Sequence, residues 1–299
     1  MRTDVICIGQ AVVDCITRGR EAEVSGKRSY RAEEIRLSVG GDAVNESFRL
    51  AGKGYAVKLF CGIGKDHAGS LLLSEIKKRG IDVSRVTVST HLATPVASLL
   101  VDPDGNRISY NSPAAMLEGY VPSADMVRDS RIVSLASLFR APLDRPDVVK
   151  GLIRAAHASG SIICCDTKVP TFRDIRLSDL AEVLPMVDYM FPNETEAAFY
   201  TGKNDYREMA AAIRAMGVKN VVIKAGPEGC YADMEEGCFS LPAIPAEVVD
   251  TTGAGDAFAA GFISGLLEGI SREDCLMAGL KEAAECVGQV GACASIPSE

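Results

Sequence analysis

The feature that most constrains this chain is a strand-to-helix turn near its C-terminal end, the run D-T-T-G-A-G-D-A-F at residues 250–258. Its glycines permit a tight bend and leave the backbone N–H groups of Gly253, Ala254 and Gly255 accessible at the positive end of a helix dipole. A helix start of this kind is a site for an anion. Asp256 follows within the first turn, where a carboxylate beside a bound anion needs a chemical reason.

Phosphoryl transfer supplies that reason. An Asp can accept the proton of an attacking hydroxyl while backbone N–H groups hold the charge that develops on the phosphoryl group. The alternative is that Asp256 only caps the helix. Two other phosphate motifs are excluded, because no G-K-[ST] follows and Phe258 stands where the dinucleotide fingerprint requires its third glycine.

The complete run closely resembles the C-terminal signature of the ribokinase-like sugar kinases of the PfkB type. The resemblance implies an ATP-dependent kinase that uses Mg²⁺. It places the anion hole at residues 253–255 and the catalytic base at Asp256. Because similar motifs occur at both ends, the resemblance covers essentially the whole chain.

Composition limits which partners we expect the chain to bind and which cellular compartment we expect it to occupy. The chain has 299 residues, 47% of them hydrophobic, and its net charge of −8 argues against nucleic acid or an anionic membrane surface as partner. No apolar run approaches the roughly 18 residues of a membrane span. The start M-R-T-D enters a strand at once, so we expect no signal peptide. The ten cysteines contain no C-x-x-C pair and the three histidines are scattered, which argues against a zinc site and predicts a reduced, cytoplasmic protein.

The N-terminal region carries candidate acceptor-binding residues. Residues 4–9 form an apolar run typical of a strand buried on both faces of a parallel sheet. Ligands gather beyond the carboxyl ends of such strands, so Asp14 is placed to bind hydroxyl groups. The alternative is a solvated loop Asp. The resemblance favours the first interpretation, because an Asp after the first strand contacts substrate hydroxyls in the family.

A second glycine turn, Gly40-Gly41, opens a predicted helix and is followed by Asp42 and Asn45. Such a turn either needs a positive φ or lets the backbone approach a ligand closely. It resembles the sugar-binding N-terminal signature of the family. Asp42, where many members carry Lys or Ala-Pro, is closer to the fructokinase and 2-keto-3-deoxygluconate kinase branches.

Two segments, residues 16–37 and 95–111, read as strands that project from the main body. The second is a hairpin around a D-P-D-G turn. In the family such segments form a small β-sheet lid that keeps water from the transferring phosphoryl group. Arg107 and Tyr110 are candidate substrate contacts, and an ordinary strand face is the alternative. Asn111 stands near where fructokinase-like and 2-keto-3-deoxygluconate-kinase-like members tend to carry Arg, and the loss of that cation weakens the case for a sugar-acid carboxylate.

Beyond residue 130 the pattern alternates between strands and helices. It predicts right-handed crossovers and a mainly parallel sheet with helices on both faces. We therefore expect a ribokinase-like three-layer α/β/α fold, with residues 1–299 forming a single kinase domain into which the lid segments are inserted.

The nucleotide side is assigned mainly by resemblance. Asn193 and Glu196 form an N-x-x-E pattern that is also a capping box. The family places these residues beside Mg²⁺ and the triphosphate, acting through water, and places Lys224, Gly226 and Gly229 against ATP.

The resemblance also implies a monovalent cation site, K⁺ in many members. Its residues here would be Asp250, Thr252, Gly291 and Ser295, and Thr252 would also lie against ATP.

Taken together, the sequence predicts an ATP-dependent kinase that phosphorylates a hydroxyl, most simply the primary alcohol of a small sugar. A nucleoside kinase of the same fold is one alternative. A non-catalytic sugar-sensing protein with a relic kinase site is another. Relatives dimerise through their lids, so a homodimer is expected by resemblance.

Overall fold

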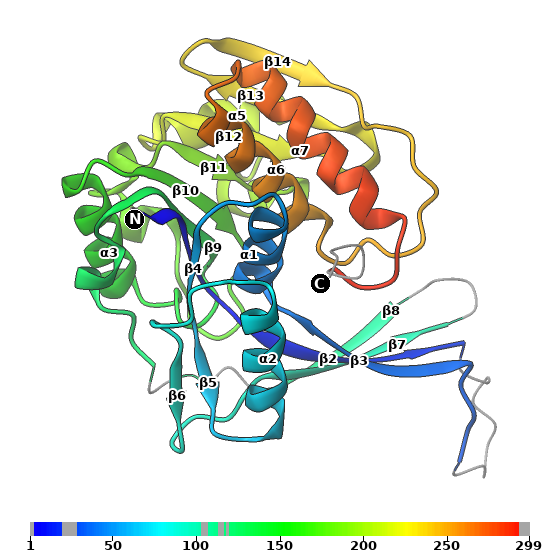
Figure 1. Cartoon of the computed structure of the whole chain (residues 1–299). Coiled ribbons are helices and arrows are strands. Elements are labelled where there is room, and N and C mark those ends of the chain that lie inside the picture. Colours follow the sequence, from blue (N-terminus) through cyan, green and yellow to red (C-terminus); the bar gives the residue numbers. More distant parts are fainter. Residues whose placement is uncertain (1–2, 20–28, 103–106, 113–116, 118–119, 293–299) are drawn as a thin grey trace.

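The computed structural model describes residues 3–19, 29–102, 107–112, 117 and 120–292. At its centre lies an eight-stranded sheet in the order β14-β13-β12-β11-β10-β9-β1-β4 (Figure 1). Its strands are β1 (Thr3–Ile8), β4 (Val57–Phe60), β9 (Ser130–Leu138), β10 (Ile162–Thr167), β11 (Tyr189–Phe191), β12 (Asn220–Lys224), β13 (Cys230–Met234) and β14 (Gly237–Leu241). The strands from β4 to β12 are parallel, as predicted, and β13 and β14 add an antiparallel hairpin at one edge.

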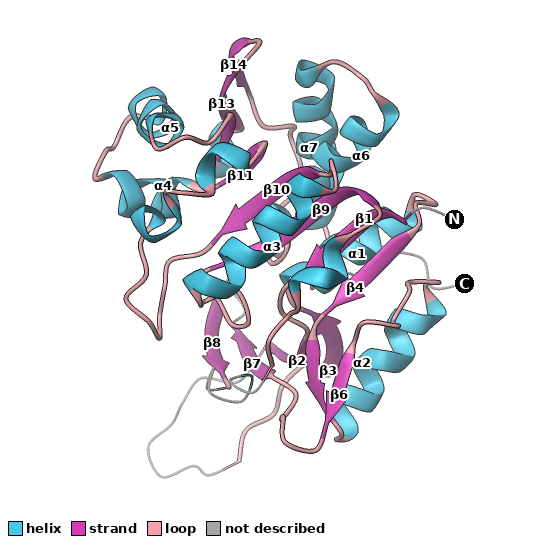
Figure 2. Cartoon of the chain, turned by 90° about the vertical axis from the view of Figure 1, so that its left-hand side faces the viewer, coloured by secondary structure: helices cyan, strands magenta, loops and turns pink. Residues whose placement is uncertain are grey.

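Helices cover both faces of this sheet and complete three layers (Figure 2). They are α1 (Asp42–Gly52), α2 (His67–Lys78), α3 (Pro146–Ala158), α4 (Glu194–Thr201), α5 (Tyr206–Ala215), α6 (Ala254–Glu268) and α7 (Arg272–Val287), with short 3₁₀ turns at Ala124–Val127, Leu177–Leu180, Leu184–Met186 and Gly226–Glu228.

Strand β1 shows why the predicted apolar run is continuous. Val5 and Cys7 pack in the core beneath α1, α2, α6 and α7, while Ile6 and Ile8 pack in the core beneath α3, α4 and α5. Successive side chains of a strand point to opposite faces, so a strand covered on both sides must be apolar throughout. The α/β fold class that the sequence predicts is confirmed.

A separate four-stranded sheet projects from the body (Figure 1). Its order is β3-β2-β7-β8, from β2 (Val12–Arg18), β3 (Glu34–Gly40), β7 (Val96–Val101) and β8 (Arg107–Asn111). The two predicted lid segments therefore do form one small sheet. Strand β2 begins earlier and β3 ends later than the predicted segment 16–37, which puts Asp14 inside β2 rather than in a loop. Most of the predicted D-P-D-G turn lies outside the described residues.

The chain leaves the main sheet soon after β4. The next strand, β5 (Gly62–Gly64), pairs in parallel with β6 (Thr87–Ser89) instead. Among the described residues, none of the helices is long and apolar enough to cross a membrane.

Candidate active site

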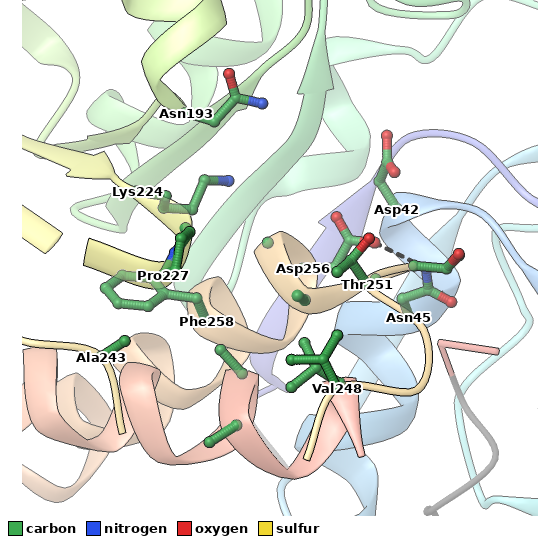
Figure 3. Close-up of a pocket in the computed structure, with 18 of the residues that line it drawn as sticks. Asp42, Asn45, Asn193, Lys224, Pro227, Ala243, Val248, Thr251, Asp256 and Phe258 are labelled. Atoms are coloured by element: carbon green, nitrogen blue, oxygen red, sulfur yellow. Dashed lines mark hydrogen bonds between the residues drawn. The ribbon is translucent and has the colours of Figure 1, made fainter. Parts of the chain in front are cut away.

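The candidate site is a cavity of about 1020 Å³ that connects the carboxyl ends of the parallel strands with the inner face of the small sheet. The N-termini of α1 and α6 both open into it, so two helix dipoles point their positive ends at the same space (Figure 3). The cavity has two ends. We call the end near Asp14, Asp42 and Asn45 the acceptor end and the end near Asn193 and Lys224 the nucleotide end, after the ligands that the sequence predicts there.

The anion turn lies between these ends. Gly253 caps α6 with φ 78°, in the left-handed region, and a Cβ there would lie 2.3 Å from the Cβ of Ala292, so only glycine fits. The N–H of Ala254 donates to the carbonyl of Thr251 at 3.2 Å, a long bond that a phosphoryl oxygen could displace. Helix α6 is buried along almost its whole length, which fixes the turn against the sheet.

Asp256 is 4% exposed at the first turn of α6. Its Oδ2 accepts a hydrogen bond of 2.7 Å from Nδ2 of Asn45, which lies one turn into α1 (Figure 3). Burial, together with the charges of Asp42 and Asp166, raises the pKa of Asp256 to about 7, against the opposing effects of Lys168 and Asn45. The structure thus brings together the two sequence motifs that lie farthest apart.

Each glycine of the pair before α1 is needed for a different reason. A Cβ at Gly40 would lie 2.6 Å from Oδ2 of Asp14 and 3.6 Å from Oδ1 of Asn45, so the absent side chain makes room between them. Gly41 has φ 95° and a Cβ there would lie 2.6 Å from the carbonyl oxygen of Gln10. Gly40 therefore allows two side chains to approach the backbone closely, and Gly41 allows a positive φ.

Two lysines enter the cavity. Nζ of Lys224 lies 2.6 Å from Oδ2 of the buried Asp166 and 3.1 Å from where a Cβ on Gly255 would be, so its ammonium group stands over the anion turn. Lys168 lies 3.7 Å from Oδ1 of Asp42 and 3.9 Å from Oδ1 of Asp256. Neither Lys168 nor Asp166 was expected from the sequence, since the D-T-K run after a predicted strand matched none of the motifs considered.

Asn193 and Glu196 form the predicted capping box at the start of α4. The side chain of each accepts a hydrogen bond of 2.9 Å from the backbone N–H of the other. Oε2 of Glu196 also accepts from Thr167, and burial raises the pKa of Glu196. Asn193 lines the cavity with Gly226 and Gly229, whereas Glu196 lies behind it.

The candidate cation residues also meet. Oδ1 of Asp250 accepts hydrogen bonds from the backbone N–H and the hydroxyl of Thr252, at 2.9 and 2.6 Å, and Oδ2 accepts from the N–H of Gly291 at 2.9 Å. Ser295 lies outside the described residues. Three of the four predicted residues are thus adjacent, held by their own hydrogen bonds.

The predicted lid contact at Tyr110 needs correction. Tyr110 is 62% exposed and does not line the cavity, whereas its neighbours Ser109 and Asn111 do. Strand alternation explains the error, because adjacent residues of β8 face opposite sides of the sheet. The side chain of Arg107 lies outside the described part of the structure.

The two ends of the cavity differ in character. Small apolar residues of the loop before α6 and of α7 line the nucleotide end, together with Pro227 and Phe258: Ala243, Ile244, Pro245, Ala246, Val248, Leu280, Ala283, Ala284 and Val287. At the acceptor end the small sheet contributes the apolar side chains of Val12, Ala97 and Leu99. Sequence reasoning missed both sets, because they come from several elements.

Comparison with known proteins supports the family resemblance of the sequence motifs. The family model described as pfkB family carbohydrate kinase matches residues 2–299. The chain belongs to this family. As a PfkB kinase it is an ATP-dependent phosphotransferase whose acceptor is a sugar or a nucleoside.

Relatives of this PfkB kinase have different printed acceptors. A cytidine kinase of Thermococcus kodakarensis is 29% identical over 84% of this chain and 88% of its own length. A 2-dehydro-3-deoxygluconokinase of Bacillus subtilis is 28% identical over 89% of this chain and 87% of its own. The structure of Arabidopsis thaliana ribokinase complexed with ribose and ATP superposes with a TM-score of 0.82 at 24% identity, covering 99% of this chain and 96% of that one, which shows a shared fold.

Proposed function

We propose that this kinase transfers the γ-phosphoryl group of ATP to a hydroxyl, most simply a primary one, of a small neutral sugar, with Asp256 as general base. One observation carries the proposal. The Asp256 carboxylate, oriented by Asn45, stands between the anion turn and the acceptor end of the same cavity.

The geometry suggests how the transfer proceeds. Asn45 occupies Oδ2 of Asp256, which leaves Oδ1 to take the hydroxyl proton. The hydroxyl oxygen forms a bond to the γ-phosphorus while the bond from that phosphorus to the β–γ bridging oxygen breaks, and ADP leaves with the electron pair. N–H groups of residues 253–255 and Lys224 stabilise the charge on the phosphoryl group.

The preference for a neutral acceptor rests on charge. Asp14, Asp42 and Asp256 bring three carboxylates to the acceptor end, against Lys168 among the cationic side chains described there. An anionic sugar acid or sugar phosphate would meet repulsion in a partly buried site, where charge interactions are strong. Carboxylates instead accept hydrogen bonds from sugar hydroxyls.

A nucleoside is the second candidate. Val12, Ala97 and Leu99 contribute aliphatic side chains to the lid side of the cavity, and side chains of this kind can pack against the face of a base. The similarity to a cytidine kinase supports the same candidate. An aliphatic platform would serve in place of an aromatic one.

The site residues fit Mg²⁺ carried by ATP. The described residues include no cluster of three or more His, Cys, Asp or Glu suited to a metal ion, so water and the triphosphate would supply most ligands. Asn193, with Glu196 behind it, would hold that shell, and the ion would neutralise charge on the β- and γ-phosphates. Asp250, Thr252 and Gly291 would hold K⁺ and stiffen the anion turn.

The test is ADP release with Mg²⁺-ATP, with and without K⁺, across ribose, fructose, 2-keto-3-deoxygluconate, a sugar phosphate and cytidine. We expect turnover on a neutral compound and a loss of about 10²–10⁴-fold in Asp256→Asn, which should still bind ATP. Turnover of Asp256→Asn at the wild-type rate would refute the base. Preference for cytidine would favour the nucleoside candidate, and tight sugar binding by calorimetry without turnover would favour a sensor.

A further inference from the structure

Lys168 is held in place more firmly than a surface lysine. It follows β10 directly, its backbone N–H donates to the carbonyl of Leu138 at 3.1 Å, and its carbonyl accepts from the hydroxyl of Tyr200. Both backbone groups are therefore fixed by neighbouring elements. The side chain then extends into the cavity, where its ammonium group lies near Asp42 and Asp256.

The second lysine of the cavity cannot take over this position. Lys224 is bound to Asp166 at 2.6 Å and stands at the nucleotide side of the anion turn. Lys168 is thus the cation, among the described side chains, that ion-pairs with the carboxylate of Asp256.

We propose that Lys168 is a positioning residue for the transfer, and that its ammonium group, close to both Asp42 and Asp256, favours the ionised form of Asp256 in the free enzyme. This inference rests on the proposed function of Asp256 as base. An ionised Oδ1 can take the acceptor's proton as the oxygen–phosphorus bond forms and ADP leaves, whereas a protonated one cannot. The charge of Asp42 has the opposite effect, so Lys168 and Asp42 oppose each other in setting the ionisation of Asp256.

The surrounding charges show why a cation is needed. Asp42 from α1 and Asp166 from β10 both raise the pKa of Asp256, which burial has already raised, while Lys168 and Asn45 lower it. The buried Glu46 of α1 also faces this group. Burial alone would lower the pKa of Lys168 itself, but Asp42, Asp166, Asp256 and Glu196 together raise it well above the usual value, so the lysine stays charged.

The direct test needs no acceptor. Carboxyl ¹³C-labelled aspartate is introduced into the full chain, the Asp256 signal is assigned by its loss in Asp256→Asn, and its pKa is followed by NMR titration. For a unit charge about 4 Å away, Lys168→Met should raise this pKa by roughly one to three units. Lys168→Arg should change it far less, and Asp42→Asn should lower it.

These variants make the outcomes decisive. An unchanged pKa in folded Lys168→Met, or an equal rise in Lys168→Arg, would overturn the proposal. If Lys168→Met does not fold, Lys168→Gln takes its place. Asp42→Asn tests the opposing effect of Asp42 independently. An Asp256 pKa that does not fall in Asp42→Asn would overturn that part of the proposal.

A kinetic measurement separates this inference from the proposed function. With the acceptor found in the panel, the acid limb of kcat/KM against pH should move to higher pH in Lys168→Met, and the lost rate should return as the pH is raised. A loss that is equal at every pH would mean a packing role and would overturn the proposal. If no compound of the panel is phosphorylated but the pKa shifts are as expected, the proposed substrate class is refuted. The role of Lys168 in ionising Asp256 is then still supported.

Discussion

At the scale of single residues, three of the buried carboxylates in and around the site differ in how their charge is stabilised. Asp166 is neutralised by Lys224 at 2.6 Å. Asp256 is oriented by Asn45 and faces Lys168. A buried charge is costly unless it is paired, and an unpaired acid takes up a proton instead.

Glu46 is the third of these acids and is fully buried on α1. Its Oε2 accepts a hydrogen bond of 2.6 Å from Ser134, and within the described structure its Oε1 has no hydrogen-bond partner. Burial raises its pKa well above the usual 4.5. We infer that Glu46 is neutral in the folded protein.

This gives a prediction for stability against pH. Above pH 4.5 the unfolded chain releases the proton of Glu46 while the folded protein keeps it, so stability falls as pH rises toward the folded pKa. The slope is at most about 1.4 kcal/mol per pH unit. Glu46→Gln has no proton to release, and its Tm should decline less steeply than that of the wild type between about pH 5 and 8.

Glu75→Gln is the matched control, because the pKa of Glu75 is lowered by Lys78 and Arg79 and it titrates below this window. Its Tm should follow the wild-type curve. Parallel Tm curves for Glu46→Gln and the wild type would show that Glu46 is ionised in the folded protein.

The sequence predicted those site residues that share a short motif. Asp256 and the anion turn lie within one run, and Asn45 follows its glycines at a fixed spacing along a helix. Lys168 could not be found this way, because its position depends on where β10 ends and on contacts with Leu138 and Tyr200, which are distant in sequence. Long-range packing, not local pattern, brings it to Asp256.

At the scale of elements, strand parity decides which lid residues face the cavity. The positions of β8 were predicted as a strand, but the sequence could not tell which of its faces turns inward. In the structure Ser109 and Asn111 face the cavity and Tyr110 faces solvent. A helix cap is less ambiguous, because the N-x-x-E spacing fixes both partners locally.

Helix α4 allows capping to be separated from nucleotide binding. Asn193→Ala removes the acceptor for the N–H of Glu196 and should destabilise the protein by about 1 kcal/mol, because a helix N-terminus loses its cap. Asn193→Ser restores a capping oxygen, so its Tm should recover. If Asn193 also holds the water shell of Mg²⁺-ATP, the KM for Mg²⁺-ATP should stay raised by roughly tenfold in both variants. Recovery of Tm and KM together in Asn193→Ser would reduce Asn193 to a cap.

At the scale of the whole molecule, the small sheet has two chemically distinct faces. Its inner face carries Asp14 and lines the cavity. Among the large hydrophobic side chains that its outer face exposes are Ile35, Leu37, Ile108 and Tyr110. Strand register aligns them in two rows across the sheet, one from Leu37 through β2 and β7 to Tyr110 and one from Ile35 to Ile108.

A contiguous exposed apolar face of this kind is typical of an interaction surface, and we propose a second copy of the chain as its occupant. A two-fold pairing buries the same face of both lids, which requires no other partner.

Leu37→Lys introduces a charge into that face and should weaken dimerisation at least tenfold, a cost of about 1.4 kcal/mol or more. Light scattering after size exclusion, over a range of concentrations, measures this. Val88→Lys, at another exposed aliphatic position that lies on the two-stranded sheet, should leave the dimer intact. A wild-type protein that stays monomeric at high concentration would contradict the proposal, and equal weakening by both variants would place the interface elsewhere.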